Sequence, residues 1–123
     1  MKISVLLPYK ENFSPTYAGA VSLFINDTTK LSKFKKTTTV YGFTKYTKKF
    51  KNRYINIETS KNFFSSSNKE YVKKFISIEK MNKSELIEIH NRPIYLNYLV
   101  NKLKNRNYIL YFHNDPLSMS GSS

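Results

Sequence analysis

The sequence predicts an α/β fold: a Rossmann-like open parallel sheet with helices on both faces, in one domain spanning residues 1–123. Three observations predict it. Short apolar runs alternate with segments of helical periodicity along the chain. Their order, β-α-β-β-α-β-α-β, is typical of an open parallel sheet. Hydrophobic residues make up 40% of the chain, which argues against disorder.

The first half of the chain contains three expected strands and one helix. Ile3 to Leu7 is a compact apolar run, as in a buried parallel strand. Apolar residues then recur at helical spacing from Val21 to Leu31. β-Branched and aromatic residues predict a second strand from Thr37 to Phe43, and a short third strand from Arg53 to Ile57.

The second half contains two expected helices, each followed by a strand. Ser67 to Glu70 fits a capping box, which predicts that a helix starts there. A strand is expected from Glu85 to Ile89. Pro93 suits the first turn of the next helix, whose apolar stripe ends at Leu103. Tyr108 to Phe112 forms the last expected strand.

Composition excludes several classes of protein. The chain has no cysteine, which excludes disulfides, and with two histidines it argues against a structural zinc site. The apolar run near Met1 is too short for a signal peptide, and no stretch has the length of a transmembrane helix. We therefore expect a cytoplasmic location, with the inner face of the membrane as a further possibility.

The formal net charge of +13 points to an anionic partner. No acidic residue occurs from Thr28 to Ile57, whereas basic residues are frequent from Lys30 to Arg53. Such a segment suits contact with an anionic membrane, a phosphorylated substrate or nucleic acid. Solvated surface lysine is the alternative interpretation.

Three loops are expected to form the binding region. Ligands of open α/β sheets sit beyond the carboxyl ends of the strands, where the strand order switches. This rule selects Pro8 to Gly19, His90 to Arg92, and His113 to Gly121. Both histidines of the chain begin two of these loops, which favours a functional site, because imidazole can donate, accept or carry a proton near neutral pH.

Two further residues in these loops are candidates for anion binding. Arg92, just before a helix, suits a carboxylate or phosphate, or is simply a surface arginine. Gly19, at the entrance to the first helix, permits a close approach of ligand to backbone. The loop is neither a dinucleotide fingerprint nor a P-loop, so NAD and ATP are not supported.

Together these residues resemble a known family. The opening strand Lys2 to Pro8, the Ala18-Gly19-Ala20 loop, and the strand ends Ile87 to Pro93 and Tyr111 to Pro116 are similar to the N-terminal domain of family 4 glycosyltransferases. These are GT-B enzymes, and the last two segments resemble bacterial members acting on surface polysaccharide or lipopolysaccharide. Residues from Lys30 to Met81 match only in element order.

The resemblance implies a retaining transfer of a sugar from a nucleotide sugar to a glycan or lipid-linked acceptor, without a metal or another cofactor. It implies that the loop with Ala18 and Gly19 approaches the donor diphosphate. It implies a place for His90 at the reaction centre. The residues that would line the acceptor cleft are Arg92, His113, Asn114 and Asp115.

Two departures from the family pattern affect this expectation. Ala18 stands where the family usually has the first of two glycines. The donor-binding second domain, with its paired glutamates, is not within residues 1–123. We therefore expect an incomplete GT-B N-terminal domain that is inactive alone and needs a separate donor-binding domain.

Two other interpretations remain open at this stage. One is a basic α/β module that binds nucleic acid or an anionic membrane without catalysis, with nucleic acid the less favoured partner. The other is a nonfunctional remnant whose exposed last strand would invite aggregation. A glycosyltransferase using Lys30 to Arg53 to reach a membrane would combine catalysis with surface binding.

Overall fold

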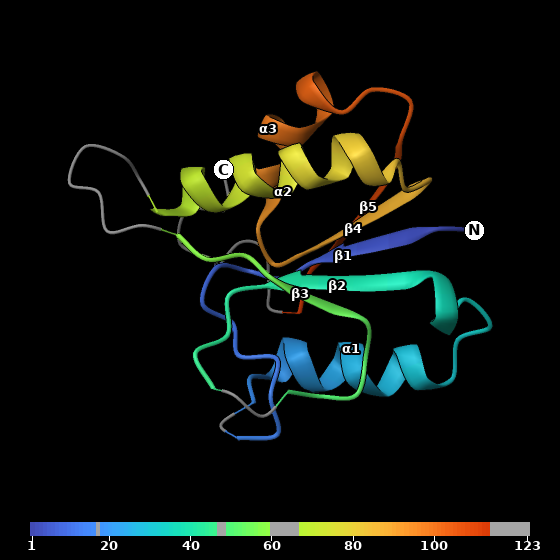
Figure 1. The fold of residues 1–123 in the computed structure, drawn as a ribbon, viewed down its shortest axis with the longest axis vertical. Coiled ribbons are helices and arrows are strands. Elements are labelled where there is room, and N and C mark those ends of the chain that lie inside the picture. The colour runs from blue at the N-terminus through green and yellow to red at the C-terminus, as the bar shows by residue number, and fades with distance from the viewer. Residues whose placement is uncertain (17, 47–48, 60–66, 114–123) are drawn as a thin grey trace.

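The computed structural model describes residues 1–16, 18–46, 49–59 and 67–113 (Figure 1). Within them lies a sheet of five parallel strands in the order β3-β2-β1-β4-β5. The strands are β1 (Ile3–Leu6), β2 (Thr38–Gly42), β3 (Tyr54–Asn56), β4 (Leu86–His90) and β5 (Asn107–Tyr111). The helices are α1 (Ala20–Lys30), α2 (Ser67–Asn82) and α3 (Pro93–Lys102), with a 3₁₀ turn, η1 (Lys35–Thr37), before β2.

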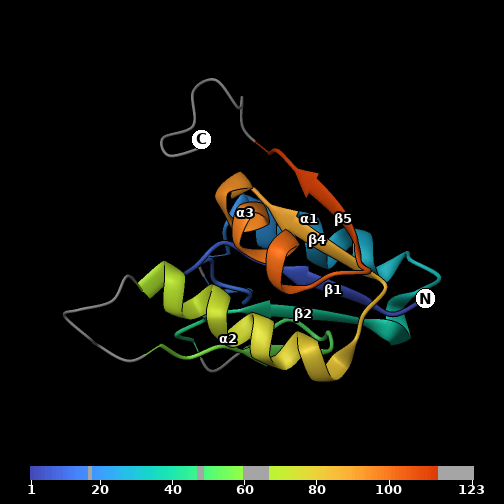
Figure 2. The same cartoon turned by 90° about the horizontal axis from the view of Figure 1, so that it is seen from above.

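The helices cover both faces of the sheet, which confirms the predicted fold class. Figure 1 shows α1 on one face and α2 and α3 on the other, and Figure 2 shows α2 and α3 side by side over the sheet. The chain leaves β1 toward β2 and β3, then returns past β1 to β4 and β5. The switch in strand order therefore lies between β1 and β4.

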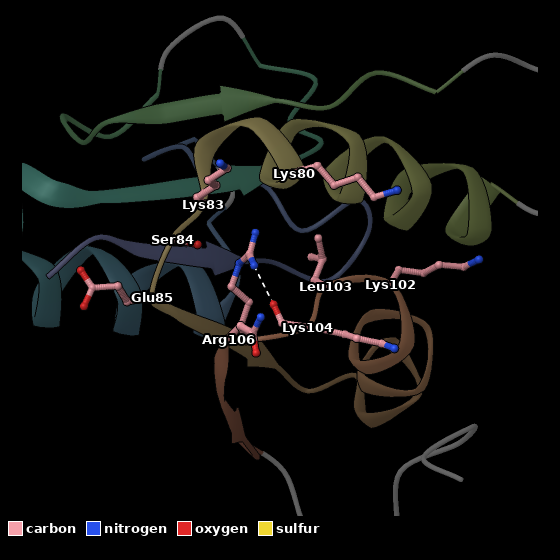
Figure 3. A pocket seen from close by; sticks show the side chains of 9 residues that line it. Lys80, Lys83, Ser84, Glu85, Lys102, Leu103, Lys104 and Arg106 are labelled. Carbon is pink, nitrogen blue, oxygen red and sulfur yellow. Dashed lines mark hydrogen bonds between the residues drawn. The ribbon is translucent and has the colours of Figure 1, made fainter.

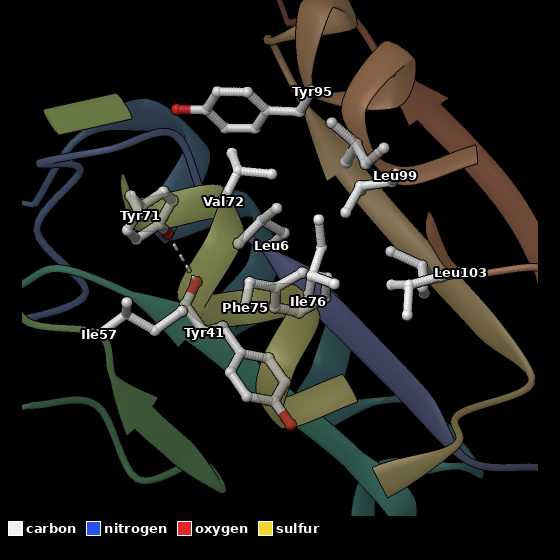
Figure 4. Close-up of a cluster of buried hydrophobic side chains, with 12 residues drawn as sticks. Leu6, Tyr41, Ile57, Tyr71, Val72, Phe75, Ile76, Tyr95, Leu99 and Leu103 are labelled. Carbon is white, nitrogen blue, oxygen red and sulfur yellow. Dashed lines mark hydrogen bonds between the residues drawn. The ribbon is translucent and has the colours of Figure 1, made fainter. Parts of the chain in front are cut away.

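Alternation along the strands divides the core into two layers. On the α2–α3 side, Leu6 and Ile89 pack with Phe75 and Leu99 in a cluster that includes three buried tyrosines (Figure 4). One of them, Tyr71, donates a hydrogen bond to the Leu7 carbonyl at 2.7 Å, so its buried hydroxyl has a partner. This bond ties the start of α2 to the end of β1.

The other layer lies under α1. Ile3, Val5 and Leu7, which alternate with the residues of the first layer, pack against Val21 and Ile25 of the helix. The spacing of these two helix residues matches the stripe that the sequence predicts. The two layers together hold β1 buried on both faces, as expected for a parallel strand.

Every predicted helix and strand is present, with small differences at the ends. Helix α2 includes Ser67, the residue that the capping box places just before the helix. Pro93 occupies the first turn of α3, as predicted. Within the described part of the chain, no helix combines the length and the apolar character needed to cross a bilayer.

The basic segment from Lys30 to Arg53 does not form one patch. Lys35 and Lys36, in η1, lie where β2 begins. Lys45 follows the end of β2 and therefore lies at the opposite end of the sheet. Parallel strands separate residues that precede a strand from those that follow it, so this segment is divided between the two ends.

Candidate functional site at the carboxyl ends of the strands

The described parts of the predicted binding loops lie beside the switch in strand order, and residues 114–121 of the third loop lie outside the described residues. His90 is the last residue of β4, and it pairs in register with Tyr111 of β5. The loop after β1 runs toward Gly19, which precedes the first turn of α1. Parallel strands bring these segments to one edge of the sheet, as the sequence predicts.

The two histidines contact each other directly. His90 Nδ1 and His113 Nε2 are 2.8 Å apart, a hydrogen-bond distance. The two facing nitrogens share one proton, so one imidazole donates and the other accepts. The sequence predicted that both residues would lie in the site, and the structure joins them into a pair.

Glu88 completes a row of three groups. It lies two residues before His90 and therefore points to the same face of β4. Its Oε2 is 3.5 Å from His90 Nε2, a nitrogen that is buried and has no hydrogen-bond partner among the described residues. A carboxylate here favours a proton on Nε2. The row Glu88–His90–His113 can thus bias the tautomers of both rings.

Aromatic rings enclose this row. The Tyr111 ring stacks on His90 with a centroid distance of 4.7 Å and an angle of 2°. Phe24 of α1 meets His113 edge-on at 4.8 Å. His90 is consequently only 1% exposed, whereas His113 is partly exposed. In this state a ligand reaches His113 before it reaches His90.

Asn91 fixes the positions of the two loops. Its φ is 56°, in the left-handed region that asparagine tolerates better than most residues. Its backbone N–H donates to the Tyr111 carbonyl at 2.9 Å, and its side-chain Oδ1 accepts from the His113 N–H at 2.7 Å. These two bonds hold the residue after β5 against the end of β4 and so maintain the histidine contact.

The environment disfavours a charge on His113. Burial lowers the pKa of this imidazole below its usual 6.5, and the neighbouring His90 lowers it further. The carboxylate of Glu11 acts in the opposite direction. His113 is therefore poised to be neutral, able to accept or donate a proton, near physiological pH.

Glu11 occupies the entrance to α1, where the sequence predicts a diphosphate. Its Oε2 accepts hydrogen bonds from the Ser22 N–H at 3.3 Å and from the Ser22 hydroxyl at 2.9 Å. A Cβ at Gly19 would lie 2.7 Å from the Glu11 carboxyl carbon. The absence of a side chain at Gly19 thus makes room for a carboxylate of the chain itself.

The remaining predicted residues lie apart from the histidine pair or outside the described region. Arg92 is exposed, and its guanidinium donates to the Asn91 carbonyl at 2.7 Å. Ala18 precedes the N-cap of α1 and is half-buried. Asn114 and Asp115, predicted to line the acceptor cleft, lie outside the described residues.

Sequence reasoning missed four contributors to the site: Glu11, Phe24, Glu88 and Tyr111. Alternation along β4 was a usable signal for Glu88, which shares a face with His90. Glu11 lies within a loop that the strand-end rule selected. Among residues 1–16, 18–46, 49–59 and 67–113, no group of three or more histidine, aspartate or glutamate side chains is arranged to hold a metal ion.

Comparisons of the chain with known protein families, with curated proteins and with solved structures find no match.

Proposed function

We propose that this chain is the N-terminal, acceptor-side part of a retaining glycosyltransferase of the GT-B type. The observation that carries the proposal is the hydrogen-bonded pair of His90 and His113 at the switch in strand order, beside the N-terminus of α1. A paired imidazole can hydrogen-bond a sugar hydroxyl or a leaving phosphate oxygen without carrying a full charge.

The pair has separate roles for its two rings in this proposal. His113 is partly exposed and makes the first contact with a sugar or acceptor. His90 is buried, with its Nδ1 held at His113 and its Nε2 beside Glu88. It sets the tautomer of His113, and it reaches the reaction centre itself only if His113 moves. Arg92, Asn114 and Asp115 remain candidates for the acceptor side.

Donor binding near Gly19 requires a rearrangement. A diphosphate and the Glu11 carboxylate are both anions, and the Ser22 N–H at the start of α1, which would attract the diphosphate, already donates to Glu11. We propose that a nucleotide sugar, held mainly by a separate donor-binding domain, displaces Glu11. The reaction would take place at the cytoplasmic side, with no metal in the chemistry of this half.

The test begins with the coding sequence that follows the Ser123 codon. A second α/β domain with paired glutamates, in frame or in an adjacent gene, is the expected finding. Joined to that domain, the protein should transfer sugar from a nucleotide sugar, whereas residues 1–123 alone should show no turnover. Robust transfer by residues 1–123 alone would contradict the division of roles proposed here.

Substitutions then test the pair. His113→Asn and His90→Asn in the joined protein should each lower turnover by roughly a hundredfold, the usual loss when one preorganised polar group is removed. Lys73→Ala, an exposed change in α2, is the matched control and should leave turnover unchanged. Full activity of both histidine variants would refute the assigned site.

The second candidate function is binding without catalysis by a basic α/β module. The observation that favours it is a concentration of lysine at the amino ends of the strands, away from the histidine pair. The two functions make different predictions. If the chain only binds a partner, reversing lysine charges at the amino ends should remove binding. If it is a transferase half, the same changes should leave the His90–His113 site and the turnover of the joined protein intact.

A further inference from the structure

The end of the sheet where the strands begin is strongly basic. We call it the amino-end surface. One part of it is a hollow of about 420 Å³ beside η1 and the start of β3, lined by Asn52 and four cations. The cations are Lys35, Lys36, Lys51 and Arg53. None of the described residues that line this hollow is a carboxylate.

A second basic hollow lies at the same end, under α2 and α3. Figure 3 shows it between the last turn of α2 and the segment that leads into β5. Its volume is about 370 Å³, and among the described residues that line it Glu85 is the one carboxylate. The cations around it are Lys80, Lys83, Lys102, Lys104 and Arg106.

Hydrogen bonds join the two hollows across the end of the sheet. The Arg53 guanidinium donates to the Lys36 carbonyl at 3.1 Å, and the Thr37 hydroxyl donates to the Met1 carbonyl. Lys2 continues the connection, because its ammonium donates to the Asn82 carbonyl at 2.8 Å. These bonds hold together, at one end of the sheet, segments that are far apart in the sequence and that lie beside the two hollows.

Helix ends explain only some of this charge. The carboxyl ends of the helices carry partial negative charge, and a lysine in the last turn of each offsets it: Lys30, Lys80 and Lys102. The cations of η1 and of the segment before β3 do not lie in the last turn of α1, α2 or α3. An excess of positive charge remains after these local roles are filled.

One buried polar group at the surface lacks a partner. Both side-chain polar atoms of Asn52 are buried and make no hydrogen bond within the described part of the chain. A buried amide of this kind costs free energy unless something pairs with it. Asn52 lines the hollow with the four cations, and its buried amide would reach a phosphate oxygen there only if the side chain turned outward.

Exposed apolar side chains accompany the charge. Leu31, the C-cap of α1, is 90% exposed, and Met81, in the last turn of α2, is 85% exposed. Met1, just before β1, is also exposed. Apolar side chains projecting among lysines are typical of surfaces that enter the headgroup region of an anionic bilayer. Contact with nucleic acid would need the charge alone.

We propose that the amino-end surface docks on a membrane rich in anionic phospholipid. Lysines contact the headgroups, and Leu31 and Met81 enter the upper part of the acyl layer. This surface is at the opposite end of the strands from the His90–His113 pair, so docking leaves that pair facing away from the bilayer. The proposal does not depend on transferase activity.

The first experiment measures binding of the full chain to vesicles. Vesicles of phosphatidylcholine with one-third phosphatidylglycerol should bind the protein at low salt, and pure phosphatidylcholine vesicles should not. Each lysine near an anionic surface contributes about fivefold to the partition coefficient. Lys36→Glu with Lys83→Glu should therefore weaken binding about 25-fold or more. Absence of binding to the anionic vesicles would overturn the proposal.

A matched control keeps the net charge the same. Lys45→Glu with Lys69→Glu makes an equal change outside the amino-end surface, after β2 and in the first turn of α2. It should weaken vesicle binding less than about threefold, because the affected charges are far from the docked lipid and are screened. An equal loss from both double variants would show that net charge alone drives binding and would overturn the assigned surface.

The apolar side chains distinguish a membrane from nucleic acid. Leu31→Ser with Met81→Ser alters only exposed groups, so the fold should persist by circular dichroism. Vesicle binding should fall about tenfold, because apolar burial in the bilayer is lost. Binding to a DNA duplex should not change. Unchanged vesicle binding, with the duplex bound as tightly as vesicles, would reject the membrane in favour of nucleic acid.

Discussion

Replacing Gly19 with alanine should expel the Glu11 carboxylate from the N-terminus of α1. Gly19 has φ −76° and ψ 167°, which alanine adopts without strain. A Cβ there would nevertheless lie 2.7 Å from the Glu11 carboxyl carbon and closer still to Oε2. Because Glu11 is a flexible side chain, it should move away rather than force the backbone to shift. The free energy of unfolding then falls by what the Glu11 contacts contributed.

The structure sets the size of this loss. Glu11 accepts from the Ser22 N–H at 3.3 Å and from its hydroxyl at 2.9 Å. For a half-buried carboxylate at a helix N-terminus, we expect these contacts to contribute about 1–2 kcal/mol together. Two further effects of Gly19→Ala oppose each other: alanine is a poorer N-cap than glycine, yet it lowers the entropy of the unfolded chain. The loss of the Glu11 contacts therefore decides whether Gly19→Ala raises or lowers the free energy of unfolding.

A double-mutant cycle isolates this contribution. Urea denaturation of the original chain, Gly19→Ala, Glu11→Ala and the double variant should give a coupling free energy of about 1–2 kcal/mol. Gly19→Ala should have little effect once Glu11 is already alanine. Additive effects, with a coupling below about 0.3 kcal/mol, would refute the idea that Gly19 is kept small by Glu11.

Three other predictions concern stability. In urea titrations, Glu79→Leu should lower the free energy of unfolding by about 2–4 kcal/mol, because the fully buried carboxylate accepts hydrogen bonds from two serines. The control Glu85→Leu, at an exposed position, should lower it by less than about 0.5 kcal/mol. The lowered pKa of His113 means that the unfolded chain binds more protons below about pH 6.5, so stability should fall as the pH drops through that value. Urea denaturation at pH 5.0 and 7.5 should show this loss of stability at the lower pH. His113→Gln should reduce the difference between the two pH values. An unchanged difference in that variant would contradict the assignment of the pH dependence to His113. Phe75→Ala should cost about 3–5 kcal/mol, since it empties part of the α2–α3 core, and a loss below 1 kcal/mol would show that the core is not packed around it.

The fold could be predicted because its signals are local. The run from Ile3 to Leu7, the apolar stripe before Lys30 and the proline that begins α3 each depend on residues close in sequence. The switch in strand order follows from the predicted Rossmann-like class, and right-handed crossovers limit the alternative orders. Only the exact ends differ, as at Ser67, because the first and last residues of a helix are the part that a sequence pattern specifies least.

The site could be predicted only in part. The strand-end rule located His90 and His113, but the distance between them depends on Asn91, whose positive φ and two hydrogen bonds are tertiary features. The occupation of the α1 entrance by Glu11 depends on the path of a loop without periodicity. Sequence alone gives no means of choosing that path, so the acidic neighbour of Gly19 was not expected.

The arrangement of charge follows from the parallel topology itself. Every helix runs opposite to the strands, so helix N-termini gather at the carboxyl ends of the strands and helix C-termini at the amino ends. Helix dipoles then favour anions at the first end and cations at the second. Glu11 and Glu70 lie at helix starts, and Lys80 and Lys102 lie in final turns, as this rule requires.

The same rule separates the two proposed activities. A histidine pair that works near neutrality would be disturbed by a dense group of ammonium ions, since nearby positive charge lowers the pKa of an imidazole further. The cations of the two hollows lie at the amino ends, so the length of a strand separates them from His113. An anionic surface can therefore be bound at one end while His113 keeps its proton equilibrium at the other. Vesicle binding should accordingly leave the NMR titration of His113 unchanged, and a large shift on docking would show that the two ends are coupled.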